Sequence, residues 1–377
     1  MKLTCTQENL NKGLFIVGHL ANKNINLPIL NNVLLKAENS ILKLATTNLE
    51  IGISCIVRGK IEKEGDFTID SKLFSDYVNL LPKGNIDINL DENDYLKVSC
   101  ENYKTKIKGM PASDFPVLPS LEKKNPFVCN VNDLRKAISQ VIFAVSTNES
   151  RNELCGVLMD FNTYDAGFIT MTATDSYRLA EKKIKLETGS EEKTTVIVPS
   201  KTLSEISRIL SVYKDSVESP QSIEITISDN QIVFSYDNVE LISRLIEGQY
   251  PDYKQIIPKE GKTKITVNSE QLTKSVKTNS LFSQSGIFDI SLEFEPEEKI
   301  IKVSSTNISV GENVSSIEVD FDGIKNSIVV NYRYLLDGLQ NTHSDDLLIE
   351  LLDSNTPCVI KPKDDPDFLY IIMPIKQ

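Results

Sequence analysis

Residues 172–180, TATDSYRLA, place four side chains that could do chemistry next to one another in one short turn. Asp175 could act as an acid or a base, Ser176 and Tyr177 carry hydroxyl groups, and Arg178 could bind an anion. An enzyme acting on DNA or on a small anion could use Asp175, Tyr177 and Arg178 as its catalytic set. The alternative is a turn in which Asp175 bonds to its own backbone, as aspartate often does.

The remaining sequence adds little to a catalytic interpretation. The two histidines, His19 and His343, have no second metal ligand at helical or turn spacing. No glycine-rich phosphate-binding motif occurs, and the six cysteines are scattered without a CxxC pair, which is typical of free thiols in a reducing compartment. We therefore expect no metal, no nucleotide cofactor and no catalytic residues.

Length and composition indicate a cytoplasmic protein of two or three domains. The chain has 377 residues, of which 40% are hydrophobic and 25% charged, as in ordinary globular proteins. No run of 18 apolar residues and no signal peptide is found, so a membrane protein is not expected. The absence of a signal peptide, together with the unpaired cysteines, disfavours a repetitive β-rich adhesion module. The net charge of −12 argues only weakly against nucleic-acid binding, because phosphates respond to the local field.

The sequence repeats itself three times. Segments 4–17, 129–142 and 265–278 each predict a short strand that leads into an amphipathic helix with polar cap residues. A second set of helices is predicted within 68–81, 197–210 and 329–341, and alternating stretches typical of antiparallel strands lie between them. We predict an α+β fold of three similar duplicated domains, 1–125, 126–258 and 259–377, each with two helices and antiparallel sheet.

Basic residues recur at matching positions of these helices. The second helices begin with Lys72, Lys201 and Arg333, where the helix dipole disfavours a cation, and each has an acid four residues later. A solvated charged face could explain any single lysine. The recurring set in an acidic chain instead favours a basic surface for the phosphates of DNA, read without sequence specificity. The full predicted set is Lys12, Lys72, Arg135, Lys136, Lys201, Arg208, Lys274, Lys277 and Arg333.

Several motifs resemble one known family along the whole chain. These are LPILNNVLL (27–35), TTNLEIGI (46–53), FPVLP (115–119), TATDSYRLA (172–180), VIVPSKTLSEISRIL (196–210), EGQYPDYKQIIPK (247–259) and YIIMPIK (370–376). They are similar to the bacterial sliding clamp, the beta subunit of DNA polymerase III. The resemblance implies a non-catalytic processivity factor: a head-to-tail homodimeric ring around double-stranded DNA, with helices inside and sheets outside. It also implies loading by an ATP-dependent clamp loader and binding of the replicative polymerase and other proteins.

The resemblance further implies a pocket for a short partner peptide that contains glutamine and hydrophobic residues. The matching positions are Leu154, Thr174, Ser176, Tyr177, Arg178, Leu179, Pro251, Asn355, Pro357, Ile371, Met373, Pro374 and Ile375. Arg151 matches a DNA-contacting loop. Where the family often has Gly-His, this chain has Ser176-Tyr177, which leaves its preference among partner peptides open.

Ring closure is expected to join two strand edges. Lys104, Lys106 and Lys108 alternate on one predicted strand, and Glu318 and Asp320 alternate on another. We predict that these edges meet across the dimer, with opposite charges setting the register. Charges that merely prevent aggregation of exposed edges would give the same pattern.

Overall fold

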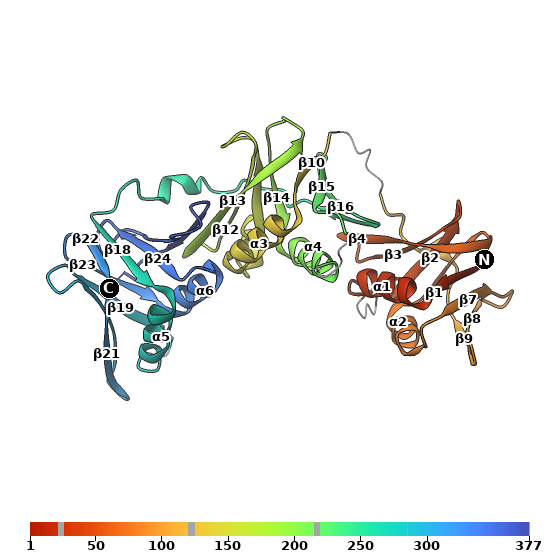
Figure 1. Cartoon of the computed structure of the whole chain (residues 1–377), viewed down its shortest axis with the longest axis horizontal. Coiled ribbons are helices and arrows are strands. Elements are labelled where there is room, and N and C mark those ends of the chain that lie inside the picture. Colours follow the sequence, from red (N-terminus) through yellow and green to blue (C-terminus); the bar gives the residue numbers. More distant parts are fainter. Residues whose placement is uncertain (22–25, 120–124, 215–218, 285, 377) are drawn as a thin grey trace. The chain divides into compact units, whose positions relative to one another are not determined.

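A computed structural model describes residues 1–21, 26–119, 125–214, 219–284 and 286–376. The chain divides into two compact units. Figure 1 labels the helices and strands of both. Unit 1 comprises residues 1–131, 188–190 and 205–245, and unit 2 comprises 132–187, 191–204 and 246–377. Each unit is described separately.

The six predicted helices are present. They are α1 (Gln7–Gly18), α2 (Ser71–Leu80), α3 (Val131–Val141), α4 (Ser200–Val212), α5 (Ser269–Ser280) and α6 (Tyr332–Thr342). They begin where the sequence predicts because short polar side chains precede them: Thr6, Asp70, Asn268 and Asn331 each accept a hydrogen bond from a backbone N–H in the following turn. Short 3-10 helices lie at Pro28–Asn31, Ala112–Asp114, Ile142–Ala144, Glu149–Cys155 and Tyr253–Ile256.

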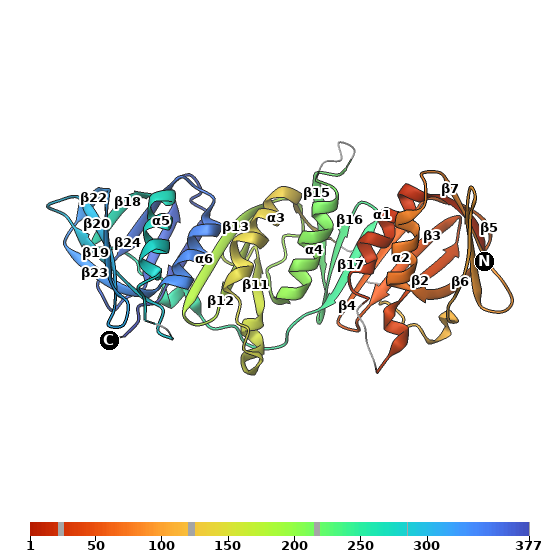
Figure 2. The same cartoon turned by 90° about the horizontal axis from the view of Figure 1, so that it is seen from below.

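Unit 1 is built from antiparallel strands with helices α1 and α2 side by side (Figure 2). Its strands are β1 (Lys2–Thr6), β2 (Asn32–Glu38), β3 (Ile41–Thr47), β4 (Ile51–Val57), β5 (Gly59–Lys63), β6 (Gly65–Asp70), β7 (Asn85–Leu90), β8 (Tyr95–Cys100), β9 (Tyr103–Lys108), β10 (Phe127–Asn130), β15 (Ser222–Ile227), β16 (Gln231–Tyr236) and β17 (Val239–Arg244). One sheet has the order β5-β1-β7-β8-β9, which leaves β9 at an edge. Helix α1 approaches β4 closely at Gly13, where an added Cβ would lie 2.7 Å from Val57 Cγ2.

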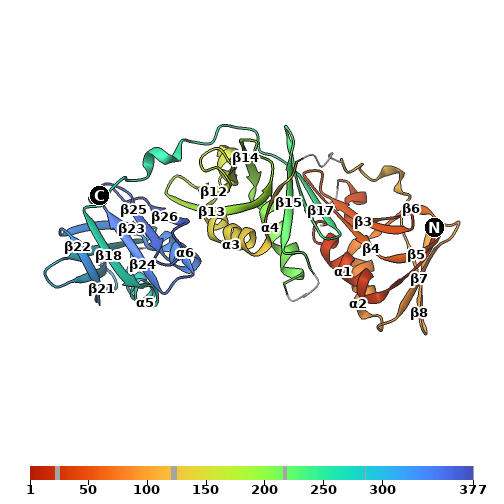
Figure 3. The same ribbon diagram turned by 45° about the horizontal axis from the view of Figure 1, so that its top comes forward.

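Unit 2 has the same kind of architecture, with α5 and α6 in contact (Figure 3). Its strands are β11 (Gly156–Phe161), β12 (Phe168–Thr174), β13 (Arg178–Gly189), β14 (Thr194–Pro199), β18 (Thr263–Asn268), β19 (Asp289–Glu295), β20 (Ile300–Asn307), β21 (Gly311–Glu318), β22 (Asp320–Gly323), β23 (Asn326–Asn331), β24 (Asp346–Leu351), β25 (Cys358–Pro362) and β26 (Phe368–Ile372). A four-stranded sheet, β21-β20-β19-β23, leaves β21 at an edge.

Candidate functional site

The turn between β12 and β13 is held by Asp175 and Thr174. The Asp175 Oδ1 atom accepts hydrogen bonds from the backbone N–H groups of Tyr177 (2.9 Å) and Arg178 (3.0 Å). The Thr174 hydroxyl accepts from the Ser176 N–H (3.1 Å) and donates to the Arg178 carbonyl (2.6 Å). The prediction that Asp175 forms the turn is confirmed, and a carboxylate engaged in this way is poorly placed to act as a general base.

Arg178 is held in place by hydrogen bonds within its own chain. Its guanidinium donates to Asp175 (3.0 Å), to Asp337 of α6 and to the Phe143 carbonyl (2.8 Å), and it lies 4.6 Å from the centroid of the Tyr334 ring. Burial lowers the pKa of Arg178, but the hydrogen bond to Asp337 and the nearby Asp175 charge outweigh it, so the pKa lies above its ordinary value. The arginine therefore joins three segments and has little capacity left for a substrate anion.

Tyr177 is exposed, and 63% of its surface is accessible. Its ring stacks on that of Tyr334, with centroids 6.3 Å apart and planes inclined by 21°. Its carbonyl accepts a hydrogen bond from the Met373 N–H (2.9 Å), which fixes the C-terminal segment beside the turn. The tyrosine pair thus forms an aromatic surface next to the last residues of the chain.

The strand that follows the turn and the strand near the C-terminus lie side by side in one sheet. Strands β13 and β26 are antiparallel neighbours, with Leu179 opposite Ile371. These two residues belong to a buried apolar cluster together with Leu158, Ile197, Tyr253 and Val359, and Ile246, Tyr250, Ile257 and Leu369 pack against it. The sequence reasoning missed most of this cluster, because its members come from strands far apart in the chain.

The other predicted pocket residues differ in how far they are exposed. Leu154 is buried, whereas Pro251 and Asn355 are exposed, and Pro357, Met373, Pro374 and Ile375 are half-buried. Arg151, predicted to contact DNA, donates to the Ser176 hydroxyl (2.9 Å) and pairs with Glu153 (3.2 Å). This places Arg151 beside the turn, so its side chain supports the candidate pocket as well.

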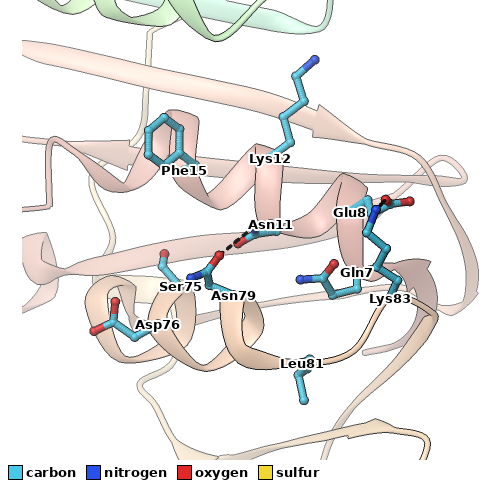
Figure 4. A pocket seen from close by; sticks show the side chains of 10 residues that line it. All are labelled: Gln7, Glu8, Asn11, Lys12, Phe15, Ser75, Asp76, Asn79, Leu81 and Lys83. Carbon is cyan, nitrogen blue, oxygen red and sulfur yellow. Dashed lines mark hydrogen bonds and ion pairs between the residues drawn. The ribbon is translucent and has the colours of Figure 1, made fainter.

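The predicted DNA-contacting residues fall into two groups. Lys72, Lys201, Lys274 and Lys277 are exposed and make no ion pair with another described residue. Lys12 is exposed and is one of the residues that line the groove between α1 and α2 (Figure 4). Its ammonium lies 3.7 Å from the centroid of the Tyr213 ring. Arg333 is exposed and lies over the Phe288 ring, while Arg135 is only half-exposed.

The second group is held by the protein itself. Lys136 pairs with Asp365 (2.8 Å), and Arg208 donates to the carbonyls of Phe15 (3.3 Å) and Ile16 (2.7 Å) at the end of α1 and to Glu205 (3.0 Å). Glu205 is also bonded to His19. Arg208 thereby satisfies carbonyl groups that a helix end leaves without partners.

Replacing Arg208 with methionine should lower the free energy of unfolding by about 2 kcal/mol, because charged hydrogen bonds to two carbonyls and to a buried carboxylate are lost. Chemical denaturation measures this. The matched change Lys201→Met, at an exposed residue of the same helix, should cost less than about 0.5 kcal/mol. Equal effects of the two changes would contradict this role for Arg208.

The predicted ring-closing residues lie on strand edges with one difference. Lys104, Lys106 and Lys108 are exposed along the edge strand β9. Glu318 ends the edge strand β21, but Asp320 begins β22, which pairs with β18 in another sheet. Strand β21 ends at Glu318, so only Glu318 of the two acids lies on that edge.

The described residues lack two features of other classes of protein. No described helix is long and apolar enough to cross a membrane. Within the same part of the chain, no group of three or more histidine, cysteine or acidic side chains is placed to hold a metal ion.

Sequence comparisons cover nearly the whole chain. Models of the DNA polymerase III beta subunit match in three parts: the N-terminal domain over residues 1–119, the central domain over 129–252 and the C-terminal domain over 254–376. The chain belongs to the DNA polymerase III beta subunit family. A beta sliding clamp of Synechocystis is 27% identical over 397 aligned residues, covering 100% of this chain and 99% of that protein.

Solved structures agree with this assignment. A DNA polymerase sliding clamp from Bacillus subtilis superimposes with a TM-score of 0.92 at 26% identity, covering 100% of this chain and 99% of the other. A DNA polymerase III beta subunit described as putative, from Eubacterium rectale, gives 0.91 at 28% identity and full coverage of both chains. The three-domain fold with antiparallel sheets, predicted from the repeats, and its assignment as a clamp, implied by the resemblance, are confirmed.

Proposed function

We propose that the protein is a processivity factor of DNA polymerase: two copies form a ring that encircles duplex DNA and slides along it. The observation that carries this proposal is the match of all three family domains, in order, to a chain with three repeated helix pairs. The ring acts by topology, so it needs no catalytic residue and no cofactor. We place it in the cytoplasm with the replication proteins, and keep 1–125, 126–258 and 259–377 as the domain limits.

The ring meets DNA through the cations on its helices. The exposed lysines of α2, α4 and α5 support this, because their charges are not neutralised by the described acidic residues. Phosphate contacts carry no sequence information and exchange readily with counterions. Such contacts suit a protein that must move along DNA of any sequence, and the acidic balance of the remaining surface disfavours binding elsewhere.

Partner proteins bind at the apolar cluster beside the β12–β13 turn. The replicative polymerase subunit, the clamp loader and other proteins would each present a short peptide with a glutamine and hydrophobic residues. Leu179 and Ile371 form the apolar centre, and Tyr177 and Met373, which share a backbone hydrogen bond, come next along the same two segments. A flexible methionine suits a surface that accepts several sequences. An enzyme centred on Asp175, Tyr177 and Arg178 is disfavoured. The Asp175 carboxylate already accepts a backbone hydrogen bond within the turn, and the Arg178 guanidinium already donates to Asp337 of α6.

The second copy closes the ring along β9 and β21. Lys104, Lys106 and Lys108 on one edge face Glu318 on the other, and opposite charges set the register. Asp320 remains a proposed contact just beyond the β21 edge. The change Lys106→Glu with Lys108→Glu should raise the dissociation constant of the dimer about tenfold or more, because like charges then meet. Sedimentation at several concentrations measures it, and an unchanged dimer would contradict this register.

The proposal is tested by two properties of the purified protein. Sedimentation equilibrium should give twice the mass of one chain, and a labelled Gln-Leu-x-Leu-Phe peptide should bind saturably in a fluorescence anisotropy titration. A scrambled peptide serves as the control. A monomer that binds neither peptide would overturn the assignment.

A further inference from the structure

A buried tyrosine and a buried glutamate hold the linker that follows the second repeat (residues 246–257). The Tyr253 hydroxyl donates a hydrogen bond to Glu181 Oε2 (2.5 Å), and the two residues are only 3% and 8% exposed. Burial and the nearby Glu181 charge raise the pKa of Tyr253, so its hydroxyl keeps the proton that it donates. A hydrogen bond to a carboxylate is stronger than one between neutral groups, so this bond fixes the position of the ring.

The pair is continuous with the centre of the candidate pocket. Glu181 lies two residues after Leu179 on β13, and side chains two apart on a strand share a face. On the neighbouring strand β26, Leu369 is opposite Glu181 and Ile371 is opposite Leu179. Tyr253 packs in the same apolar cluster as Leu179 and Ile371. A shift of the Tyr253 ring would therefore reach the pocket directly.

The pair also fixes the residues just before Tyr253. The Tyr253 N–H donates to the carbonyl of Pro251 (2.8 Å), one of the predicted pocket residues, so the place of the ring sets that of the proline. Tyr250 holds the other end, because its hydroxyl donates to the Thr172 carbonyl on β12 (3.4 Å). The linker is thus attached to β12 and β13 on either side of Pro251.

The first repeat contains the same kind of turn but not the pair. In it the Ile51 N–H donates to Asn48 Oδ1 (2.7 Å), as the matching N–H does to Asp175 in the second repeat. Three residues after Ile51, Ser54 stands where the second repeat has Glu181. The first repeat therefore offers no carboxylate to a linker residue at this place.

The linker after the first repeat differs in a corresponding way. Its Leu118, in FPVL, matches Tyr253 in YPDY. The Leu118 side chain lies against Gly52, the counterpart of Leu179: a Cβ added at Gly52 would be 2.6 Å from Leu118 Cδ2. The matching linker residue is therefore directed to different places in the two repeats, over the pocket-centre position in the first and toward the carboxylate in the second.

We infer that Glu181 and Tyr253 are positioning residues for partner binding, because their hydrogen bond fixes the linker in the arrangement that receives the peptide. They act through Pro251 and the apolar cluster and need not touch the peptide themselves. The inference rests on the proposed peptide site and adds what keeps that site in shape. A preformed site binds more tightly, because less order has to be created when the peptide binds.

Tyr253→Phe tests this inference by removing the hydroxyl while keeping the ring. It should weaken binding of the Gln-Leu-x-Leu-Phe peptide at least about fivefold, since a hydrogen bond to a charged group is lost and the linker is no longer fixed. Glu181→Gln keeps an acceptor for the hydroxyl and should stay within about twofold of the unchanged protein. Fluorescence anisotropy measures the affinities, and sedimentation shows whether each variant is still a dimer.

Tyr236→Phe is the matched control. Tyr236 is 4% exposed, and its hydroxyl donates to the Pro220 carbonyl (2.9 Å) in unit 1, so this change also removes a hydrogen bond of a buried tyrosine. It should lower the stability against chemical denaturation but alter the peptide affinity less than about twofold.

A double variant separates positioning from stability. Tyr253→Phe with Glu181→Leu removes both polar groups, so stability should recover, because no buried carboxylate is left without its partner. Peptide affinity should stay at least about threefold weaker, because the bond that directs the linker is absent. Recovery of affinity together with stability would overturn the inference, as would an unchanged affinity of the Tyr253→Phe protein. An unchanged protein that binds no peptide would instead defeat the proposed peptide site.

Discussion

Replacing Met373 with aspartate is expected to weaken binding of a Gln-Leu-x-Leu-Phe peptide by at least about thirtyfold, because a bound apolar side chain would strip water from the new carboxylate. Met373 is half-buried and is tied to Tyr177 through its backbone, which the change leaves in place. Fluorescence anisotropy with the labelled peptide measures the loss.

Val117→Asp provides the control for this experiment. Val117 is an exposed apolar residue of unit 1, so its change adds the same charge and should alter peptide affinity less than twofold. The Met373→Asp protein should still be a dimer by sedimentation. Full peptide affinity in a folded Met373→Asp protein would place the binding site elsewhere.

The second large effect concerns DNA. Replacing Lys72, Lys201, Lys274 and Lys277 together with alanine should reduce the salt dependence of duplex binding. Each lost phosphate contact lowers the slope of log affinity against log salt by about 0.9. The ring contains two chains and therefore loses eight such lysines, so the slope should change by up to about 7, and binding should weaken markedly at moderate salt. Titration of a labelled duplex at several salt concentrations measures the slope.

A second quadruple variant distinguishes the effect of where the lysines lie from the effect of the total charge that is removed. Lys63, Lys193, Lys299 and Lys363 are exposed lysines that lie outside the helices, and their replacement removes the same total charge. This protein should keep most of the salt dependence. Equal slopes for the two quadruple variants would mean that the helices do not form the DNA-facing surface.

The sequence predicts the local parts of this structure well. The helices begin after short polar residues that accept backbone hydrogen bonds, so their positions depend on a few neighbouring residues. The same holds for Asp175, whose bonds reach only two and three residues along the chain. The repeat and the fold follow, because the local pattern occurs three times.

Long-range partners are different, because no local pattern encodes them. Arg178 binds Asp337, 159 residues away, and Arg208 binds a carbonyl 192 residues away. Backbone carbonyls have no signature in the sequence, so the role of Arg208 at the end of α1 could not be foreseen from its type. The sequence shows that each second helix has an acid four residues after its basic residue. Only the structure shows that two of these acids form hydrogen bonds with these arginines.

The ring-closing strands show a further limit. Alternating charges predicted one continuous strand through Glu318 and Asp320, whereas the chain passes from one sheet to another at Val319. Buried and exposed side chains continue to alternate where the chain passes from one sheet to the other. The sequence pattern alone therefore could not reveal the change of sheet. The exposed apolar residues Leu73, Leu281 and Val310 were likewise missed, because isolated apolar residues in a sequence usually indicate a core.

The central claim is that the protein holds DNA by encircling it. The most direct measurement compares its retention on closed circular DNA and on the same DNA cut once. The protein is first loaded onto the circle by a clamp loader with ATP and then passed through a sizing column. We predict that it stays with circular DNA in moderate salt and is lost after the DNA is made linear, because a ring can slide off a free end. Equal retention on the circular and the linear form would contradict the account.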